Sequence, residues 1–384
     1  MRIIDSLCAN FYFRLKLFES YSNFIGSIKE ITNYSSRDVY AGFKAGLFDL
    51  DDLHCWFACY QKDQELYDYY YDSLRSLVDR DFLTKKISAV ELKLVKDGWS
   101  GINEYLKSFN LSPYVDIQPW VTIEDSKSDL IKNGPLVSII MPAFNAERTI
   151  YVAIKSILNQ TYANFELIVI NDCSTDKTAE IVENICKLDR RVTIINLDKN
   201  YGSYFSRNIG LSHSKGEFIT VHDADDISHP QKLNLQITEI LAHRRCLGSI
   251  SYWIRVDQYG NISLKRGLPL LRLNISSLLF HRSVPSKIGN WQSSRFGADL
   301  EYLERIKSAF SRNAIIKLHL PLSLGLYRED SLTTIKATSV FNRTGLQARI
   351  RYEEKWRREH LALFHPQIYK LLQIIDKKLL NKDS

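Results

Sequence analysis

The sequence contains no apolar stretch near the roughly 20 residues that a helix needs to cross a bilayer. Its opening, MRIIDSLCANFYFRL, also lacks the continuous apolar core and the small-residue cleavage site of a signal peptide. From these two absences we expect the chain to stay in the cytosol.

Cysteine is scarce as well, with six residues in a chain of 384. Six thiols are too few for a disulfide scaffold, and we expect them to be reduced in the cytosol. His54, Cys55 and Cys59 stand close together, but no second ligand pair follows them and aromatic residues flank them. We interpret this group as helix core.

Two phosphate-binding motifs are absent. No G-x-G-x-x-G follows the first predicted strand, and G-x-x-x-x-G-K-[ST] occurs nowhere. The net charge of +7 is too small to identify an anionic partner. Since the chain has no motif of interleaved aromatic and basic residues, we expect no nucleic-acid partner.

The chain does contain two different patterns. Residues 1–125 show helical patterning, which predicts a helical N-terminal module. After Pro135, apolar strands alternate with helical segments, which predicts an α/β fold with a Rossmann-like, mostly parallel sheet covered on both faces. The predicted strands are 136–141, 165–170, 192–197 and 218–221, and the predicted helices are centred on 150–158, 181–188 and 202–213.

Polar residues follow each predicted strand, where open α/β sheets bind their ligands. They are Asn145, Asp172, the segment 200–208, and the segment 223–226. We expect these four groups to converge on one rim of the sheet.

The fourth group is an acidic cluster, since Asp223, Asp225 and Asp226 come directly after an apolar run. Three ionised carboxylates repel one another unless solvent, a helix N-terminus or a cation offsets their charge. Mg²⁺ and Mn²⁺ prefer oxygen ligands, and Mg²⁺ takes only one or two protein carboxylates beside water and phosphate. The alternative is a solvated turn that caps the next helix.

That next helix is predicted to begin at Ser228, the candidate N-cap, with Gln231 as its capping-box partner. Its predicted core face is Leu233, Ile237, Ile240 and Leu241. Strand-like segments follow at 249–256 and 275–281, and then a helix at 299–310.

The C-terminal end is basic, with ten Lys or Arg against five Asp or Glu from Phe341 to Ser384. Its last element, residues 368–382, has the pattern of a basic amphipathic helix. Such a helix either lies on an anionic membrane surface or docks on its own domain.

The order of these motifs resembles the family 2 glycosyltransferases of the GT-A fold, the nucleotide-diphospho-sugar transferases. The resemblance covers about Leu136 to Ile306 and rests on Pro142-x-x-Asn145, Asp172, Arg207-Asn208 and Asp223-Ala224-Asp225-Asp226. It implies that Pro142, Asn145 and Asp172 bind the nucleotide and that Arg207 contacts the donor. It further implies that Asp223 and Asp225 form the D-x-D pair, with Asp223 also contacting the donor and Asp225 the direct ligand of Mn²⁺ or Mg²⁺.

The segment Trp291 to Glu301 resembles the acceptor side of the family, where an acidic residue before a helix is the catalytic base. The resemblance assigns that role to Asp299, and the alternative is a helix-capping residue. Residues 327–333 resemble the closing loop of relatives, but Glu329-Asp330 stand where a histidine often follows the arginine. His281 and His319 are the alternative third metal ligands.

The implied activity is metal-dependent, inverting transfer of a hexosyl or N-acetylhexosaminyl group, with a UDP-sugar as the expected donor. The expected acceptor is a glycan or lipid-linked glycan of bacterial surface-polysaccharide synthesis, reached at the inner face of the cytoplasmic membrane. The implied domains are the helical module 1–125, the GT-A domain 135–335 and basic C-terminal helices 336–384. The alternative function is a non-catalytic subunit that binds nucleotide-sugars or glycans.

Overall fold

The computed structural model describes residues 89–117, 121–123, 131–257, 259–260, 262, 271–326, 343–367 and 369–370. All of them except Arg343 belong to one compact unit, residues 89–339 and 344–384. The group His54, Cys55 and Cys59, the closing segment 327–333 and residues 371–382 of the predicted basic helix lie outside the described residues.

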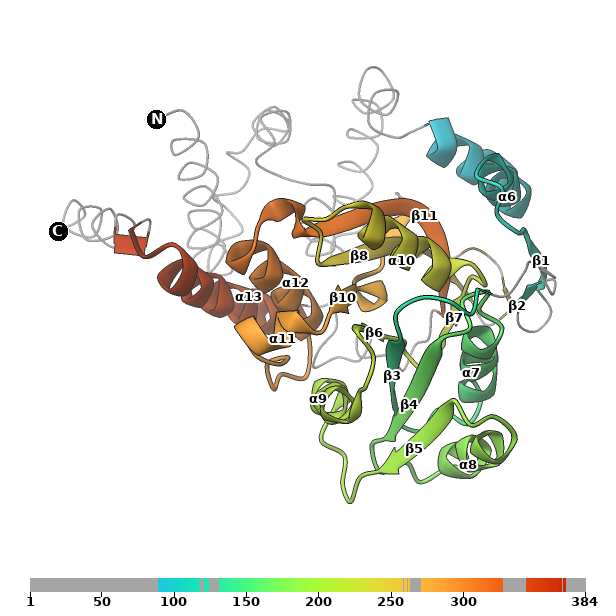
Figure 1. Ribbon diagram of the computed structural model, residues 1–384, viewed down its shortest axis with the longest axis horizontal. Coiled ribbons are helices and arrows are strands. Elements are labelled where there is room, and N and C mark those ends of the chain that lie inside the picture. Colours follow the sequence, from blue (N-terminus) through green and yellow to red (C-terminus); the bar gives the residue numbers. More distant parts are fainter. Residues whose placement is uncertain are drawn as a thin grey trace. The chain divides into compact units, whose positions relative to one another are not determined.

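The unit is built on a nine-stranded sheet with the order β5-β4-β3-β6-β10-β8-β11-β7, with β9 paired to β8 beside this path (Figure 1). Its first half is parallel and confirms the predicted α/β class. The strands of this half are β3 (Val137–Ala143), β4 (Phe165–Asn171), β5 (Val192–Asn196) and β6 (Phe218–Val221), and the helices between them are α7 (Ile150–Leu158), α8 (Thr178–Leu188) and α9 (Ser203–His213).

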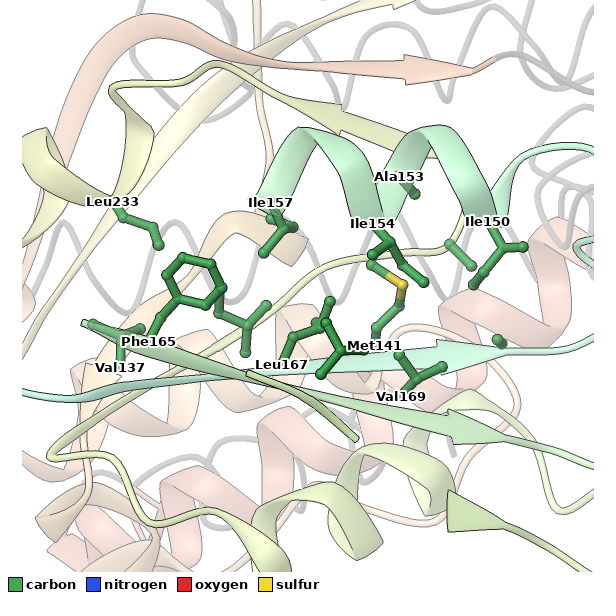
Figure 2. Packing of buried hydrophobic residues seen from close by; sticks show 14 of the residues in the cluster. Val137, Met141, Ile150, Ala153, Ile154, Ile157, Phe165, Leu167, Val169 and Leu233 are labelled. Atoms are coloured by element: carbon green, nitrogen blue, oxygen red, sulfur yellow. The ribbon is translucent and has the colours of Figure 1, made fainter. Parts of the chain in front are cut away.

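The central strands are apolar throughout because both of their faces are buried. Side chains alternate across a strand, so Val137 and Met141 of β3 face α7, whereas Ile140 faces α9 and α12. Figure 2 shows Ile150, Ile154 and Ile157 of α7 pointing down onto the strands.

The second half of the sheet is mostly antiparallel. Its strands are β7 (Asp226–Ser228), β8 (Gly248–Val256), β9 (Arg272–Leu273), β10 (Leu279–His281) and β11 (Ile315–Leu326). The helices are α10 (Lys232–Ala242), α11 (Ser283–Ile288), α12 (Ala298–Ala309) and α13 (Arg343–Phe364), with short 3-10 turns η2 (Ile275–Ser277) and η3 (Arg312–Ala314). The predicted strand at 249–256 and helix at 299–310 are confirmed within one residue at each end.

Three expectations were wrong. The helix after the acidic cluster begins at Lys232 rather than Ser228, because Asp226–Ser228 pairs with β11 as strand β7. Leu241 is 57% exposed, since it lies about 100° around the helix from buried Ile240. The predicted strand at 275–281 is a 3-10 turn followed by a three-residue strand.

The predicted helical module also contains strands. After α6 (Ala89–Ser108), residues β1 (Tyr114–Ile117) and β2 (Val121–Ile123) form a two-stranded antiparallel sheet. Ile102 and Leu106 of α6 are fully buried in a cluster with residues of β8 and β11. Helix α6 therefore contributes to the core of the described unit.

Helix α13 is held against α12 by a buried hydrogen bond. Glu301 of α12 is fully buried, and its Oε1 lies 2.7 Å from Nε2 of His360 in α13. Its Oε2 accepts a hydrogen bond of 2.8 Å from Arg305, one turn along α12. Because a buried carboxylate requires such partners, this group fixes the helix that carries Asp299 in its first turn.

Packing of α9 on the sheet predicts the effect of a substitution at Gly210. An added Cβ would lie 2.3 Å from Cγ2 of Ile140, which is fully buried. We expect Gly210→Ala to lower the free energy of unfolding by about 1–2 kcal/mol, because overpacking outweighs the better helix propensity of alanine. Urea denaturation measures this change. The control is Ser212→Ala at an exposed position of the same helix, and a net stabilisation by Gly210→Ala would contradict this account.

Candidate active site

The loop after β3 carries the first predicted nucleotide contacts. Pro142 is buried just beyond the point where β3 stops pairing with β6, which suits a residue without an N–H. Asn145 has φ 47°, and its Oδ1 accepts a 2.9 Å hydrogen bond from the N–H of Thr175. Asn145 thus ties the loop after β3 to the loop after β4.

Asp172 follows β4 and orders the loop before α9. Its side chain is 2% exposed, and its two carboxylate oxygens accept 2.8 Å hydrogen bonds from the N–H groups of Tyr201 and Gly202. Gly202 adopts φ 94°, which a residue with a side chain rarely adopts. The structure therefore links the second and third predicted polar groups at one rim of the sheet.

Arg207 of α9 forms a buried ion pair with Asp223, which follows β6. The distance from Nη2 to Oδ1 is 2.8 Å, and Arg207 is 4% exposed. The other carboxylate oxygen of Asp223 accepts a 2.8 Å hydrogen bond from Ser276. Burial raises the pKa of Asp223, but Arg207 and Ser276 outweigh that effect, so the pKa lies below its ordinary value.

Asp299 lies in the first turn of α12, where Gly297 is the N-cap residue. Its Oδ1 accepts a 2.9 Å hydrogen bond from the hydroxyl of Tyr204 in α9 and another, also 2.9 Å, from its neighbour Leu300. The alternative that Asp299 is the N-cap residue is therefore wrong, because Gly297 occupies that position, although the carboxylate does accept a first-turn N–H.

These side chains meet around one pocket. Arg207 and Asp299 line it together with Val221, Ile275, Ser276, Leu278 and Trp291. Asn208 positions the last of these, because its side chain makes hydrogen bonds to both the N–H (3.0 Å) and the carbonyl (2.9 Å) of Trp291. Arg207, Asp223 and Asp299, which are far apart in the sequence, are therefore neighbours.

The other two carboxylates of the acidic cluster differ in burial. Asp225 lies half-buried in the turn between β6 and β7, whereas Asp226 is 3% exposed at the start of β7. Burial, followed by the charges of Asp225 and Asp223, raises the pKa of Asp226 well above its ordinary value.

Behind the turn, α10 supplies a buried cation. Lys232 is 3% exposed, and its Nζ donates a 3.2 Å hydrogen bond to Oγ of Ser228. Burial lowers its pKa to about 8, although Asp226 and Asp223 act to raise it. His222, also buried, has a pKa lowered to about 3 by burial and by Lys232, so it stays neutral.

The donor set suits a hard divalent cation that takes few protein ligands. Asp223 and Asp225 offer carboxylate oxygens at one turn, but no group of three His, Cys, Asp or Glu within the described residues could hold a metal. His281 pairs with Phe218 at the opposite end of β6, and His319 stacks on Tyr252, roughly 20 Å along β11 from the partner of Asp226. The residues fit Mg²⁺ or Mn²⁺ with a shell completed by phosphate and water.

Sequence reasoning missed several of these residues. Tyr204, Ser276 and Lys232 gave no local signal, because each contacts a site residue from a different segment of the chain. Only the position of Lys232, four residues after Ser228 on the next helix, hinted at a cation behind the acidic cluster.

A sheet with a parallel half and acidic residues at its strand ends is the architecture of the GT-A class. Residues 138–284 match the model of the family "Glycosyl transferase family 2". This segment of the chain is therefore similar to that family, and the fold class predicted from the sequence is confirmed.

Individual relatives agree with the family match. The chain is 47% identical over 109 residues to an uncharacterized glycosyltransferase of Haemophilus influenzae, covering 28% of this chain and 44% of the relative. It is 37% identical over 153 residues to the Escherichia coli UDP-Glc:alpha-D-GlcNAc-diphosphoundecaprenol beta-1,3-glucosyltransferase WfgD, covering 40% of this chain and 53% of the relative. The chain thus spans about half the length of these relatives.

Among solved structures, TarS of S. aureus residues 1–349 in complex with UDP-GlcNAc is similar at a TM-score of 0.42 and 22% identity. That similarity covers 51% of this chain and 59% of TarS. No helix in the part of the chain that the structure describes is long and apolar enough to span a membrane.

The buried lysine predicts a pH dependence of stability. Between pH 8 and 10.5 the unfolded chain binds a proton at Lys232 that the folded chain does not, so this residue makes stability rise with pH in that window. We expect the unfolding free energy of wild type, relative to Lys232→Met, to increase by up to about 3 kcal/mol across it. Urea denaturation at a series of pH values tests this. Lys187→Met, at an exposed position of α8, is the control, and a difference independent of pH would contradict it.

Proposed function

We propose that the chain is an inverting glycosyltransferase that moves a sugar from a nucleotide-diphosphate donor to a glycan acceptor. The observation that carries the proposal is one pocket, formed mostly by the segment that matches the family 2 model, which Arg207 and Asp299 line together and at which Asp223 is bonded to Arg207. A cation and carboxylates on one side, with a further carboxylate opposite, are what transfer from a diphosphate requires.

On the donor side, Asn145 and Asp172 order the loops at the rim, and Pro142 ends the strand that leads there. These three residues are proposed to shape the nucleotide pocket. Arg207 is suited to a phosphate oxygen because its guanidinium stays charged, and its pKa is raised because Asp223, Tyr204 and Asp299 outweigh the lowering effect of burial. Asp223 orients Arg207 and, in the proposal, contacts the donor.

Asp225, together with Asp223, would hold Mn²⁺ or Mg²⁺. When bound, such an ion neutralises charge on the diphosphate as it leaves. Asp225 is proposed as the direct ligand because it is the second aspartate of the D-x-D pair, in the half-buried turn between β6 and β7.

Asp299 is proposed as the catalytic base. It would accept the proton of the acceptor hydroxyl while that oxygen forms a bond to the anomeric carbon and the bond from that carbon to the diphosphate oxygen breaks. One displacement of this kind inverts the anomeric centre and needs no covalent enzyme intermediate.

The relatives support the choice of substrates. The name of the E. coli relative specifies UDP-Glc as donor and a diphosphoundecaprenol-linked sugar as acceptor. By analogy we propose a UDP-sugar as donor, a hexosyl or N-acetylhexosaminyl group as the unit transferred, and a glycan or lipid-linked glycan as acceptor in surface-polysaccharide synthesis. Two further proposals concern the whole chain. We propose that the basic C-terminal helix makes peripheral contact with the inner face of the membrane. We also propose that the chain divides into the domains 1–125, 135–335 and 336–384.

The proposed roles predict different losses for two substitutions. We expect Asp299→Asn to lower kcat by roughly 100-fold or more with little change in donor affinity, because a base acts only in the chemical step. Asp225→Asn should weaken both donor binding and the dependence on manganese. The measurement is nucleotide release from a panel of nucleotide-sugars, with glycan acceptor, in manganese or in EDTA.

Glu304→Gln is the matched control, because this residue lies on the same helix as Asp299 and pairs with Lys307 at 2.6 Å. Full transfer activity in Asp299→Asn would refute the assigned base. Donor binding by wild type without any turnover would instead favour the non-catalytic binding subunit.

A further inference from the structure

Four side chains form a continuous chain from the acidic turn to α12. Asp223 is bonded to Arg207 at 2.8 Å, and the guanidinium carbon of Arg207 lies 4.9 Å from the ring centroid of Tyr204. The hydroxyl of Tyr204 donates to Oδ1 of Asp299 at 2.9 Å. Tyr204 is therefore the physical link between the donor side of the pocket and the proposed base.

The phenol of Tyr204 is held protonated, and its ring is held in one orientation. The residue is 6% exposed and packs among the apolar side chains between the sheet and α12. Burial, followed by the charge of Asp299, raises its pKa well above the ordinary value, so the phenol remains a hydrogen-bond donor. A neutral donor of this kind stabilises the ionised form of the carboxylate that it contacts.

The contact also distinguishes the two oxygens of Asp299. Oδ1 accepts bonds from both Tyr204 and the N–H of Leu300, whereas within the described residues no hydrogen bond reaches Oδ2. Among the described residues, the groups whose pKa responds to the charge of this carboxylate are Tyr204 and Arg207 on α9 and Tyr352 on α13. Tyr204 alone among these three donates a hydrogen bond to it.

We propose that Tyr204 is a positioning residue for the transfer reaction: it fixes Oδ1 of Asp299, so that Oδ2 takes the proton of the acceptor hydroxyl. This inference rests on the proposed function, since it assigns to Tyr204 an effect exerted through the proposed base. It also couples base and donor, because Arg207, which packs on the ring of Tyr204, is held by Asp223.

The test compares two tyrosines of the same core. Tyr204→Phe keeps the ring and removes the hydroxyl that Asp299 contacts. Tyr302→Phe is the matched control, because Tyr302 is fully buried in the same cluster and its hydroxyl has no hydrogen-bond partner among the described residues. A purely structural contribution of a buried hydroxyl would affect both variants through stability alone.

We expect Tyr204→Phe to lower kcat about tenfold at pH 7, which corresponds to about 1.4 kcal/mol. KM for the donor should stay constant, and Tyr302→Phe should match wild type in both quantities. Steady-state kinetics at pH 7 with the full chain measure them.

Two results would overturn the inference in different ways. A kcat of Tyr204→Phe equal to wild type, while Asp299→Asn is inactive, would refute the positioning effect and leave the proposed function intact. Full activity in Asp299→Asn would remove the base itself, and with it both proposals.

Discussion

The structure depends on the balance of charge at the end of β6. Asp223, Asp225 and Asp226 lie within four residues at this strand end, and such carboxylates repel one another strongly when they are partly buried. Two buried cations lie beside them: Arg207, paired with Asp223, and Lys232, whose pKa Asp226 and Asp223 act to raise. The folded chain accommodates the repulsion among these carboxylates because α9 and α10 place Arg207 and Lys232 beside them.

The surrounding sheet makes that arrangement rigid. Pairing of β7 with β11 fixes Asp226 opposite Gly325, while Asp172 fixes the loop from which α9, and hence Arg207, begins. Asn208 fixes Trp291 through two hydrogen bonds to its backbone. The residues that line the pocket thus come from α9, β6, the turn η2, the loop at Trp291 and α12, which only tertiary packing brings together.

Helix α12 connects this site to the C-terminal part of the described unit. Its first turn carries Asp299, which is bonded to Tyr204 on one side, and two residues later the buried Glu301, which contacts His360 of α13. The proposed base therefore lies on a helix that is held by both α9 and α13. Helix α13 follows the segment of the family match, which ends at residue 284.

The sequence by itself determined the periodic elements and the order of the motifs. Strands such as 137–143 and 165–171 are largely apolar because both of their faces are buried. Helices such as 178–188 show a stripe of apolar residues because one of their faces is buried. Local sequence patterns therefore predict both kinds of element. The convergence of Asn145, Asp172, Arg207 and Asp223 at strand ends followed from parallel topology.

Tertiary structure alone decided the rest. Strand β7 is only three residues long and exists because β11, roughly 100 residues later, pairs with it, so no local periodicity could reveal it. The same applies to Tyr204 at Asp299 and Ser276 at Asp223. Their partners are distant in the chain, and a contact that is set by the packing of one element on another leaves no trace in the residues on either side.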